Sequence, residues 1–411
     1  MKRRQFNTAA AAAVAGAFLP SFARAQAGPI RIGFLTVRTG ALAAGGKQLE
    51  QGMELFLKER NSTIAGRKVE LIIADTGGNP AGAKNKTQEL VEKDHVHVIV
   101  GPLAAFEALA IDDYIRQAGT PLVADSAGAE DLTQRKANPW FVRTVTSSAQ
   151  PNHVLGDYAA KVLGYKRVAV IADDFAYGHE CVGGFQRVFE ESGGKVVQKL
   201  WPPLNVADYG SYVGQIKKNV DAVYAGFAGA NGLRFLKQYA EYGMKLPVLG
   251  SQTTADEGIL KNMGDEALGV ITAKWYSAAI DTPENRSFVE SVNKAYGADP
   301  GFYTLGAYSA GALIEAAAKA VGGKVEDKAA FMKALRAAKV DTVRGAVRFD
   351  DYGNVIGDVF IRKVERKDGR LVNSIVATYP NVTQFFTYDP KQFLANPVYS
   401  RDYPPAKNLE P

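Results

Sequence analysis

Residues 30–37 read IRIGFLTV and residues 167–172 read RVAVIA, and a helical pattern follows each of these apolar, β-branched runs. After the first run, Leu49, Met53 and Phe56 recur at the spacing of one helix face. Short β-branched runs that alternate with amphipathic helices are typical of βαβ units built around a parallel sheet. The sequence therefore predicts an α/β fold with parallel-rich sheets.

The same order of runs occurs twice. Further strand-like runs lie at 68–74, 96–100 and 121–124 in the first half, and at 195–200, 221–225 and 247–250 in the second. The offset between the halves is 127 residues from Val69 to Val196, 124 from Val96 to Val220, and 126 from Pro121 to Pro247. Offsets this regular predict two lobes of the same topology, although few residues are identical between them.

The sequence of the last third of the chain predicts fewer helices and strands. We expect strands at 272–276, 343–349 and 359–364 and a long alanine-rich helix at 302–321, with a turn at 350–354. The final thirty residues hold many aromatic residues and prolines without clear periodicity. We expect a C-terminal tail packed across the surface and partly disordered.

Composition excludes several classes of protein. Hydrophobic residues make up 46% of the 411 residues and charged residues 22%, as in soluble globular proteins. One cysteine and four histidines argue against a disulfide framework or a zinc cluster. The net charge of +6 falls to +2 without the first 25 residues, and no basic stripe follows them. We therefore expect no nucleic-acid partner.

The N-terminus has the pattern of an export signal. Arg3 and Arg4 precede an apolar run at 8–19 that is too short to span a bilayer. Residues 23–25, Ala-Arg-Ala, predict cleavage before Gln26. The arginine pair resembles a twin-arginine signal, and an ordinary Sec signal is the alternative. Both routes predict a soluble periplasmic protein.

The ordered set of motifs resembles the periplasmic substrate-binding proteins of ABC importers, in the leucine/isoleucine/valine-binding (type I) group. The resemblance extends from about Ile30 to Tyr379. Its carriers are IRIGFL at 30–35, Thr39-Gly40-Ala41, VIVGP at 98–102, TPLV at 120–123, FVRT at 141–144, Ala176-Tyr177-Gly178, and VRGAVRFDDYGN at 343–354.

The resemblance implies two Rossmann-like lobes joined by three hinge segments near 144–148, 275–279 and 341–345. Lobe 1 would be residues 30–143 plus 280–340, lobe 2 residues 149–274 plus 346–380, and the tail residues 381–411. It also implies a monomer without cofactor or metal that captures a small molecule by lobe closure. The partner would be an inner-membrane permease with cytoplasmic ATPases.

Three matching positions depart from the branched-chain amino-acid binders of this family. Ala105 stands where a serine holds the ligand carboxylate, and Gly128 stands where a threonine holds both ligand termini. Gln252 stands where an acidic residue pairs with the ammonium group. A buried ammonium group without an anion costs several kcal/mol, so these departures argue against an α-amino acid.

The remaining candidates favour an aromatic carboxylate of the benzoate, hydroxybenzoate or cinnamate type. Aromatic side chains at Phe106, Tyr177, Phe227 and Trp275 would pack against the ring, and Arg38 could hold the carboxylate. Ser126 and backbone N–H groups offer another anion site. The full candidate set is Arg38, Thr39, Ala105, Phe106, Ser126, Ala127, Gly128, Tyr177, Phe227, Gln252, Thr253 and Trp275.

Other interpretations stay open at this point. Phe106 could be a packing residue, and Arg38 a solvated loop charge. The ligand could be a branched-chain amino acid or a small amide, and the protein could present it to a sensor instead of a permease. An enzyme is disfavoured because the sequence has no Gly-x-Ser-x-Gly, Walker, Gly-x-Gly-x-x-Gly or His-Glu-x-x-His motif.

Overall fold

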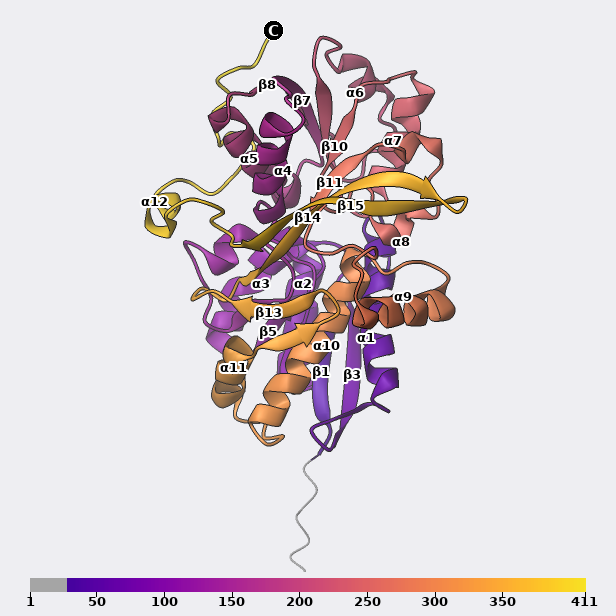
Figure 1. Cartoon of the computed structure of the whole chain (residues 1–411). Helices are drawn as coiled ribbons and strands as arrows, with labels where there is room; N and C mark the ends of the chain where they lie inside the picture. The colour runs from indigo at the N-terminus through magenta and orange to yellow at the C-terminus, as the bar shows by residue number, and fades with distance from the viewer. Residues whose placement is uncertain (1–27) are drawn as a thin grey trace, which may run out of the picture.

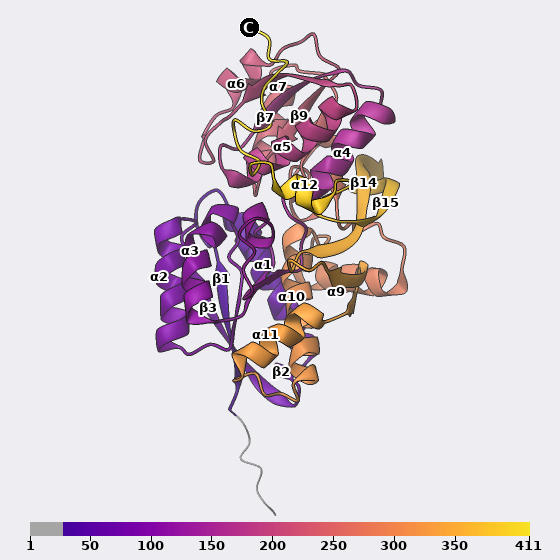
Figure 2. The ribbon, with the colours of Figure 1, turned by 90° about the vertical axis from the view of Figure 1, so that its left-hand side faces the viewer.

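The computed structural model describes residues 28–411, which form two lobes stacked one above the other (Figures 1 and 2). The predicted export signal, residues 1–25, and its cleavage site before Gln26 lie outside the described residues. Within residues 28–411, no helix is long and apolar enough to cross a membrane.

Lobe one is built on a six-stranded sheet with the order β2-β3-β1-β4-β5-β6. Its central strand β1 (Ile30–Thr36) is almost wholly buried, as expected for a parallel strand covered on both faces. The other strands are β2 (Thr63–Ile64), β3 (Arg67–Asp75), β4 (Val98–Val100), β5 (Leu122–Ala124) and β6 (Phe141–Arg143). The β2–β3 pair is antiparallel and the remaining pairs are parallel.

Lobe two is built on a nine-stranded sheet with the order β12-β13-β14-β11-β10-β9-β7-β8, in which β15 pairs with β14. Its parallel part consists of β7 (Arg167–Ala172), β8 (Lys195–Leu200), β9 (Ala222–Gly226), β10 (Val248–Gly250) and β11 (Ile271–Lys274). Its antiparallel part consists of β12 (Val340–Thr342), β13 (Gly345–Phe349), β14 (Val355–Lys367) and β15 (Arg370–Val382).

The helices pack around these sheets. Helices that pack on lobe one are α1 (Ala43–Glu59), α2 (Pro80–Gln88), α3 (Ala105–Ala118), α9 (Pro283–Tyr296), α10 (Phe302–Ala320) and α11 (Lys328–Ala337). Those of lobe two are α4 (Gln150–Lys161), α5 (Ala176–Glu191), α6 (Gly210–Gln215), α7 (Asn231–Glu241) and α8 (Glu257–Leu260).

The predicted fold class is confirmed. The order β3-β1-β4-β5 in lobe one repeats as β8-β7-β9-β10 in lobe two, as the regular offsets indicated. The chain passes between the lobes three times: after β6, after β11, and between β13 and β14, since β12 and β13 lie beside lobe one (Figure 1). Loops at the carboxyl ends of both sets of parallel strands therefore meet where the lobes face each other.

The long hairpin β14–β15 differs from the sequence prediction. The sequence predicted a strand only at 359–364, whereas β14 and β15 each have thirteen residues. Asn373, Pro380 and Asn381 made the second strand hard to recognise, because Asn and Pro are depleted in strands. Pairing with β14 along most of its length compensates for this weak local preference.

The C-terminal segment, residues 383–411, contacts both lobes. It contains α12 (Pro390–Leu394). Glu410 forms two bonds with Arg167 of lobe two, at 2.6 and 2.9 Å. On lobe one, the Gln384 side chain donates to the carbonyl oxygen of Thr133 at 2.9 Å, and Arg135 Nε donates to that of Asn396 at 2.7 Å.

His153 on α4 is buried against Tyr399 of the C-terminal segment, and it makes the free energy of unfolding depend on pH. Burial and the nearby Arg187 lower the pKa of His153 to about 3, and its Nε2 lies 3.0 Å from the Tyr399 hydroxyl. The unfolded imidazole binds a proton below pH ~6.5, whereas the folded one stays neutral. The contribution of the neutral His153 to the free energy of unfolding is therefore complete above pH ~6.5. It falls by up to ~1.4 kcal/mol per pH unit as the solution is acidified.

We expect His153→Phe to remove this part of the pH dependence. Urea unfolding at pH 7, 5.5 and 4.5 should give a shallower decline in the free energy of unfolding for the variant than for the wild type. Equal slopes for the two proteins would show that His153 is already protonated in the folded state.

Candidate functional site

A pocket of about 330 Å³ lies between the lobes, at the carboxyl ends of parallel strands from both sheets. This volume includes space at the mouth of the pocket that is open to solvent. Loops after β1, β4, β5, β7, β9 and β10 contribute to it, together with the start of α10. The lining residues are Leu42, Leu103, Ala104, Ala105, Ser126, Gly128, Phe175, Tyr177, Ala228, Thr253, Phe302 and Tyr303.

Four aromatic rings dominate the lining. Phe175 and Tyr177, at the start of α5, lie nearly parallel with ring centroids 6.0 Å apart. Phe302 and Tyr303, at the start of α10, meet edge to face at 5.1 Å. Such a site favours a flat apolar ligand, since aromatic pairs stack with an offset or meet edge to face.

The hydroxyl groups of the pocket have defined hydrogen-bond roles. Because the Thr253 hydroxyl donates to the carbonyl oxygen of Phe227 (2.7 Å), Tyr177 is the donor in its 2.7 Å bond to Thr253. Tyr303 accepts from the N–H of Gly229 at 3.4 Å, which leaves its own proton free. The Tyr177 oxygen can therefore accept from a ligand hydroxyl, and Tyr303 can donate to a ligand oxygen.

None of the lining residues within 28–411 is charged. Asp173 accepts from the N–H of Ala228 at 2.8 Å and from Asn231 at 2.7 Å, and burial raises its pKa to about 7. Asp173 thereby fixes the loop that carries Ala228, one wall of the pocket.

Helix α3 begins at the pocket. Its cap residue Ala104 has no side chain that can satisfy the first N–H groups of the helix. Glu107 accepts from the N–H of Ala104 at 3.0 Å and from Thr76 at 2.5 Å, and burial raises its pKa. A helix N-terminus with unpaired N–H groups attracts anions.

Five of the twelve candidate residues line the pocket: Ala105, Ser126, Gly128, Tyr177 and Thr253. Ala127 lies between two of them and is buried. Gly128 faces Ser148 across the interface, where a Cβ atom would lie 2.6 Å from the serine oxygen. The hydroxyl of Ser126 donates to the carbonyl oxygen of Leu103 at 2.8 Å.

Arg38 and Thr39 do not reach the pocket. Both are exposed, and the Arg38 side chain, 49% accessible, donates to both carboxylate oxygens of Glu50 at 2.8 and 2.9 Å. The structure therefore does not bring Arg38 into position to hold a ligand carboxylate. Glu50, about two turns into α1, pairs with its charge instead.

Phe106 and Phe227 pack away from the lining. Phe106 meets Phe175 edge to face at 5.5 Å, behind one of the pocket rings. Phe227 is fully buried in the core of lobe two, with Tyr209 and Phe235 at 5.3 and 4.7 Å. Phe227 contributes its backbone to the site, because its carbonyl oxygen accepts from Thr253.

Gln252 and Trp275 lie next to the pocket as buried donors. Gln252 accepts from Thr146 at 3.3 Å, and its Nε2 has no partner in the protein. Trp275 packs on Phe302 at 5.7 Å and under Arg344 at 4.4 Å, and its Nε1 also has no partner. Buried donors without partners are costly, so each is available to an acceptor-rich ligand.

Sequence reasoning missed seven lining residues: Leu42, Leu103, Ala104, Phe175, Ala228, Phe302 and Tyr303. Five of them follow strands that the sequence predicted, so the position of each strand end was an available signal. Phe302 and Tyr303 start a predicted helix whose sequence gives no sign that it reaches the loops of the second lobe.

Comparison with known proteins identifies the class. A family model described as "Periplasmic binding protein" matches residues 29–370, and the chain belongs to that family. Its relatives are substrate-binding components of ABC transporters, a family that works in the periplasm and delivers ligand to a membrane permease. The resemblance noted in the sequence is thereby confirmed.

Three similar proteins illustrate this relationship. Leu/Ile/Val-binding protein homolog 6 of Brucella melitensis is 28% identical over 365 residues, covering 86% of this chain and 93% of the relative. An ABC transporter substrate-binding protein from Sphaerobacter thermophilus has 34% identity and a TM-score of 0.80, over 87% of this chain and 99% of the other. A solute-binding protein from Rhodopseudomonas palustris BisB5, solved with 3,4-dihydroxybenzoic acid, has 34% identity and a TM-score of 0.83, over 87% and 98%.

Proposed function

We propose that this chain captures a small aromatic carboxylate, of the benzoate or hydroxybenzoate type, and delivers it to the permease of an ABC importer. The observation that carries the proposal is the uncharged pocket with four aromatic rings and unpaired donors around it. The Rhodopseudomonas neighbour that holds 3,4-dihydroxybenzoic acid supports it.

The polar groups suit both ends of such a ligand. The start of α3, Nε2 of Gln252 and Nε1 of Trp275 offer donors to a carboxylate. The Tyr177 oxygen offers an acceptor to a ring hydroxyl, because its proton is used on Thr253. The proposal therefore favours a hydroxylated ring over an unsubstituted one.

A branched-chain amino acid is the alternative that the Brucella relative suggests. Its ammonium group needs an anion. Asp125, next to Ser126, is buried without a hydrogen-bond partner but does not line the pocket, and burial raises its pKa well above the usual range. Within residues 28–411, no carboxylate lines the pocket to pair with an ammonium group, so the aromatic acid is favoured.

A thermal-shift screen of residues 26–411 tests the proposal. The compounds are benzoate, 4-hydroxybenzoate, 3,4-dihydroxybenzoate, cinnamate, leucine, valine and acetamide. A ligand at a hundred times its Kd adds about 2.7 kcal/mol to stability, so a bound compound raises the melting temperature visibly. We expect a rise with the hydroxybenzoates and none with leucine. A rise with leucine alone would contradict the proposal.

A further inference from the structure

Asp256 joins the two lobes beside the pocket. Its Oδ1 accepts from the backbone N–H of Phe302, the first residue of α10, at 2.7 Å. Its Oδ2 accepts from Gly258 at 3.1 Å, which caps its own helix α8. Because α8 packs on lobe two and α10 on lobe one, the bond from Phe302 to Asp256, called here the closure contact, crosses the interface.

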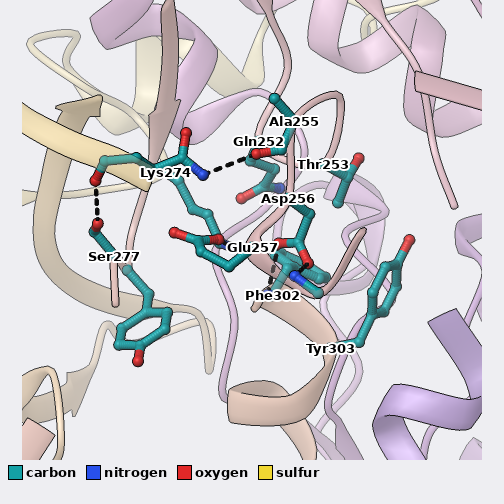
Figure 3. A network of polar contacts seen from close by, with 12 residues as sticks. Gln252, Thr253, Ala255, Asp256, Glu257, Lys274, Ser277, Phe302 and Tyr303 are labelled. Carbon is teal, nitrogen blue, oxygen red and sulfur yellow. Dashed lines mark hydrogen bonds and ion pairs between the residues drawn. The ribbon is translucent and has the colours of Figure 1, made fainter. Parts of the chain in front are cut away.

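A buried network of charged side chains also holds the carboxylate of Asp256 (Figure 3). Lys274 Nζ lies 2.5 Å from Asp256 and 2.8 Å from Glu257, and Arg362 lies 2.5 Å from Glu257. All four side chains are at most 2% exposed. The network lies wholly in lobe two, so Asp256 keeps its cation whether or not α10 is in contact.

Helix α10 depends on lobe two for its cap. Its own cap residue, Gly301, makes no side-chain bond to the helix. A Cβ atom at Gly301 would lie 1.9 Å from Asp256 Oδ2, so only glycine allows this approach. The backbone of Gly301 is extended, with φ −112°, and would accept alanine if Asp256 were further away.

At two more glycines along the same interface, an added Cβ atom would clash with the opposite lobe. A Cβ atom at Gly229 of lobe two would lie 2.7 Å from the carbonyl oxygen of Ala41 in lobe one. One at Gly258 would lie 2.1 Å from Gln48 on α1. The lobes therefore meet in close contact around the pocket. The closure contact is the member of this set that holds the first N–H group of α10, the helix that begins with the lining residues Phe302 and Tyr303.

We propose that Asp256 is a positioning residue for ligand capture: on lobe closure it caps α10 and so fixes Phe302 and Tyr303 against the ligand. In the open protein the carboxylate stays in the lobe-two network and the start of α10 is uncapped. Part of the ligand affinity then comes from a contact that the ligand does not touch. This inference rests on the pocket being the binding site, but not on the identity of the ligand.

Gly301→Ala tests the proposal, with Gly214→Ala as the matched control. The new methyl group at 301 meets Asp256 only when the lobes are closed, whereas a methyl group at Gly214 on α6 would have no neighbouring atom within 4 Å. Calorimetric titration uses 4-hydroxybenzoate, or leucine if leucine is the compound that binds the wild type. We expect the Kd to rise at least tenfold in Gly301→Ala and to stay within twofold in Gly214→Ala.

The melting temperature of the free protein separates this role from a merely structural one. We expect both variants to melt within ~2 °C of the wild type when no ligand is present. An unchanged Kd in Gly301→Ala would overturn the proposal. A fall of more than ~4 °C in the free variant would also overturn it, because the contact would then belong to the fold without ligand.

A wild type that binds no compound of the screen would contradict the proposed function but not this inference. Small-angle scattering of the ligand-free variants then carries the test. Equal radii of gyration for Gly301→Ala and Gly214→Ala are the expected result, and a larger radius for Gly301→Ala would overturn the proposal, because the contact would then hold the lobes together without ligand.

Discussion

Replacing Thr253 with aspartate is expected to weaken the binding of 4-hydroxybenzoate at least ~100-fold, a loss of about 2.7 kcal/mol. Thr253 lines a pocket without charged side chains and is 2% exposed. A new carboxylate there would share a small, water-poor pocket with an anionic ligand, where like charges repel strongly. Calorimetric titration at pH 7.5 measures the change.

Thr253→Ser is the matched control, because serine keeps the hydroxyl that donates to Phe227 and accepts from Tyr177. We expect its Kd to stay within about threefold of the wild-type value, a difference below ~1 kcal/mol. The melting temperature of each free variant shows whether it has folded. An aspartate variant that folds and binds the aromatic acid as the wild type does would contradict our placement of the ligand.

Replacing Lys274 with methionine is expected to lower the free energy of unfolding by ~3–5 kcal/mol, the usual effect of removing one partner from a buried ion pair. Lys274 is fully buried and bonds both Asp256 and Glu257. In the variant, Asp256 would keep no cation and Glu257 only Arg362. Urea unfolding at pH 7 gives the difference.

Lys261→Met is the control for this change, since Lys261 also lies beside α8 but is exposed and bonds only the carbonyl oxygen of Gly297. Its effect should stay within ~0.5 kcal/mol. Similar stabilities for the two variants would show that the network contributes little.

The same network also predicts sensitivity to acid. Burial on its own would raise the pKa of Glu257, but Arg362 and Lys274 lower it to about 2. An unfolded glutamate titrates near ~4.3, so this contribution to stability is present above that pH and is lost as the pH falls towards 2. Urea unfolding of Lys274→Met should show a weaker loss than the wild type over that range.

The fold could be predicted from the sequence because its signals are local. Ile30–Thr36 and Arg167–Ala172 are β-branched runs long enough to specify buried strands on their own. The hairpin β14–β15 was only half predicted, because β15 is stabilised by pairing more than by its own residues.

The candidate site was predictable only where it lies directly after a strand. Ser126, Tyr177 and Thr253 follow β5, β7 and β10 closely, so strand ends located them. Phe227 also follows a strand, but its side chain turns into the core of lobe two. Whether such a side chain points into the pocket or into the core depends on packing against residues that are distant in the sequence. Arg38 shows the same limit, since Glu50 comes near it only when α1 has folded.

The charge network around Asp256 also constrains how this chain can evolve. Two acids and two bases balance within one buried cluster at positions 256, 257, 274 and 362. Loss of any one leaves an uncompensated charge whose cost is a large part of the ~5–15 kcal/mol that keeps a domain folded. Homologues should therefore retain all four residues or replace them together, and intermediate combinations should be rare.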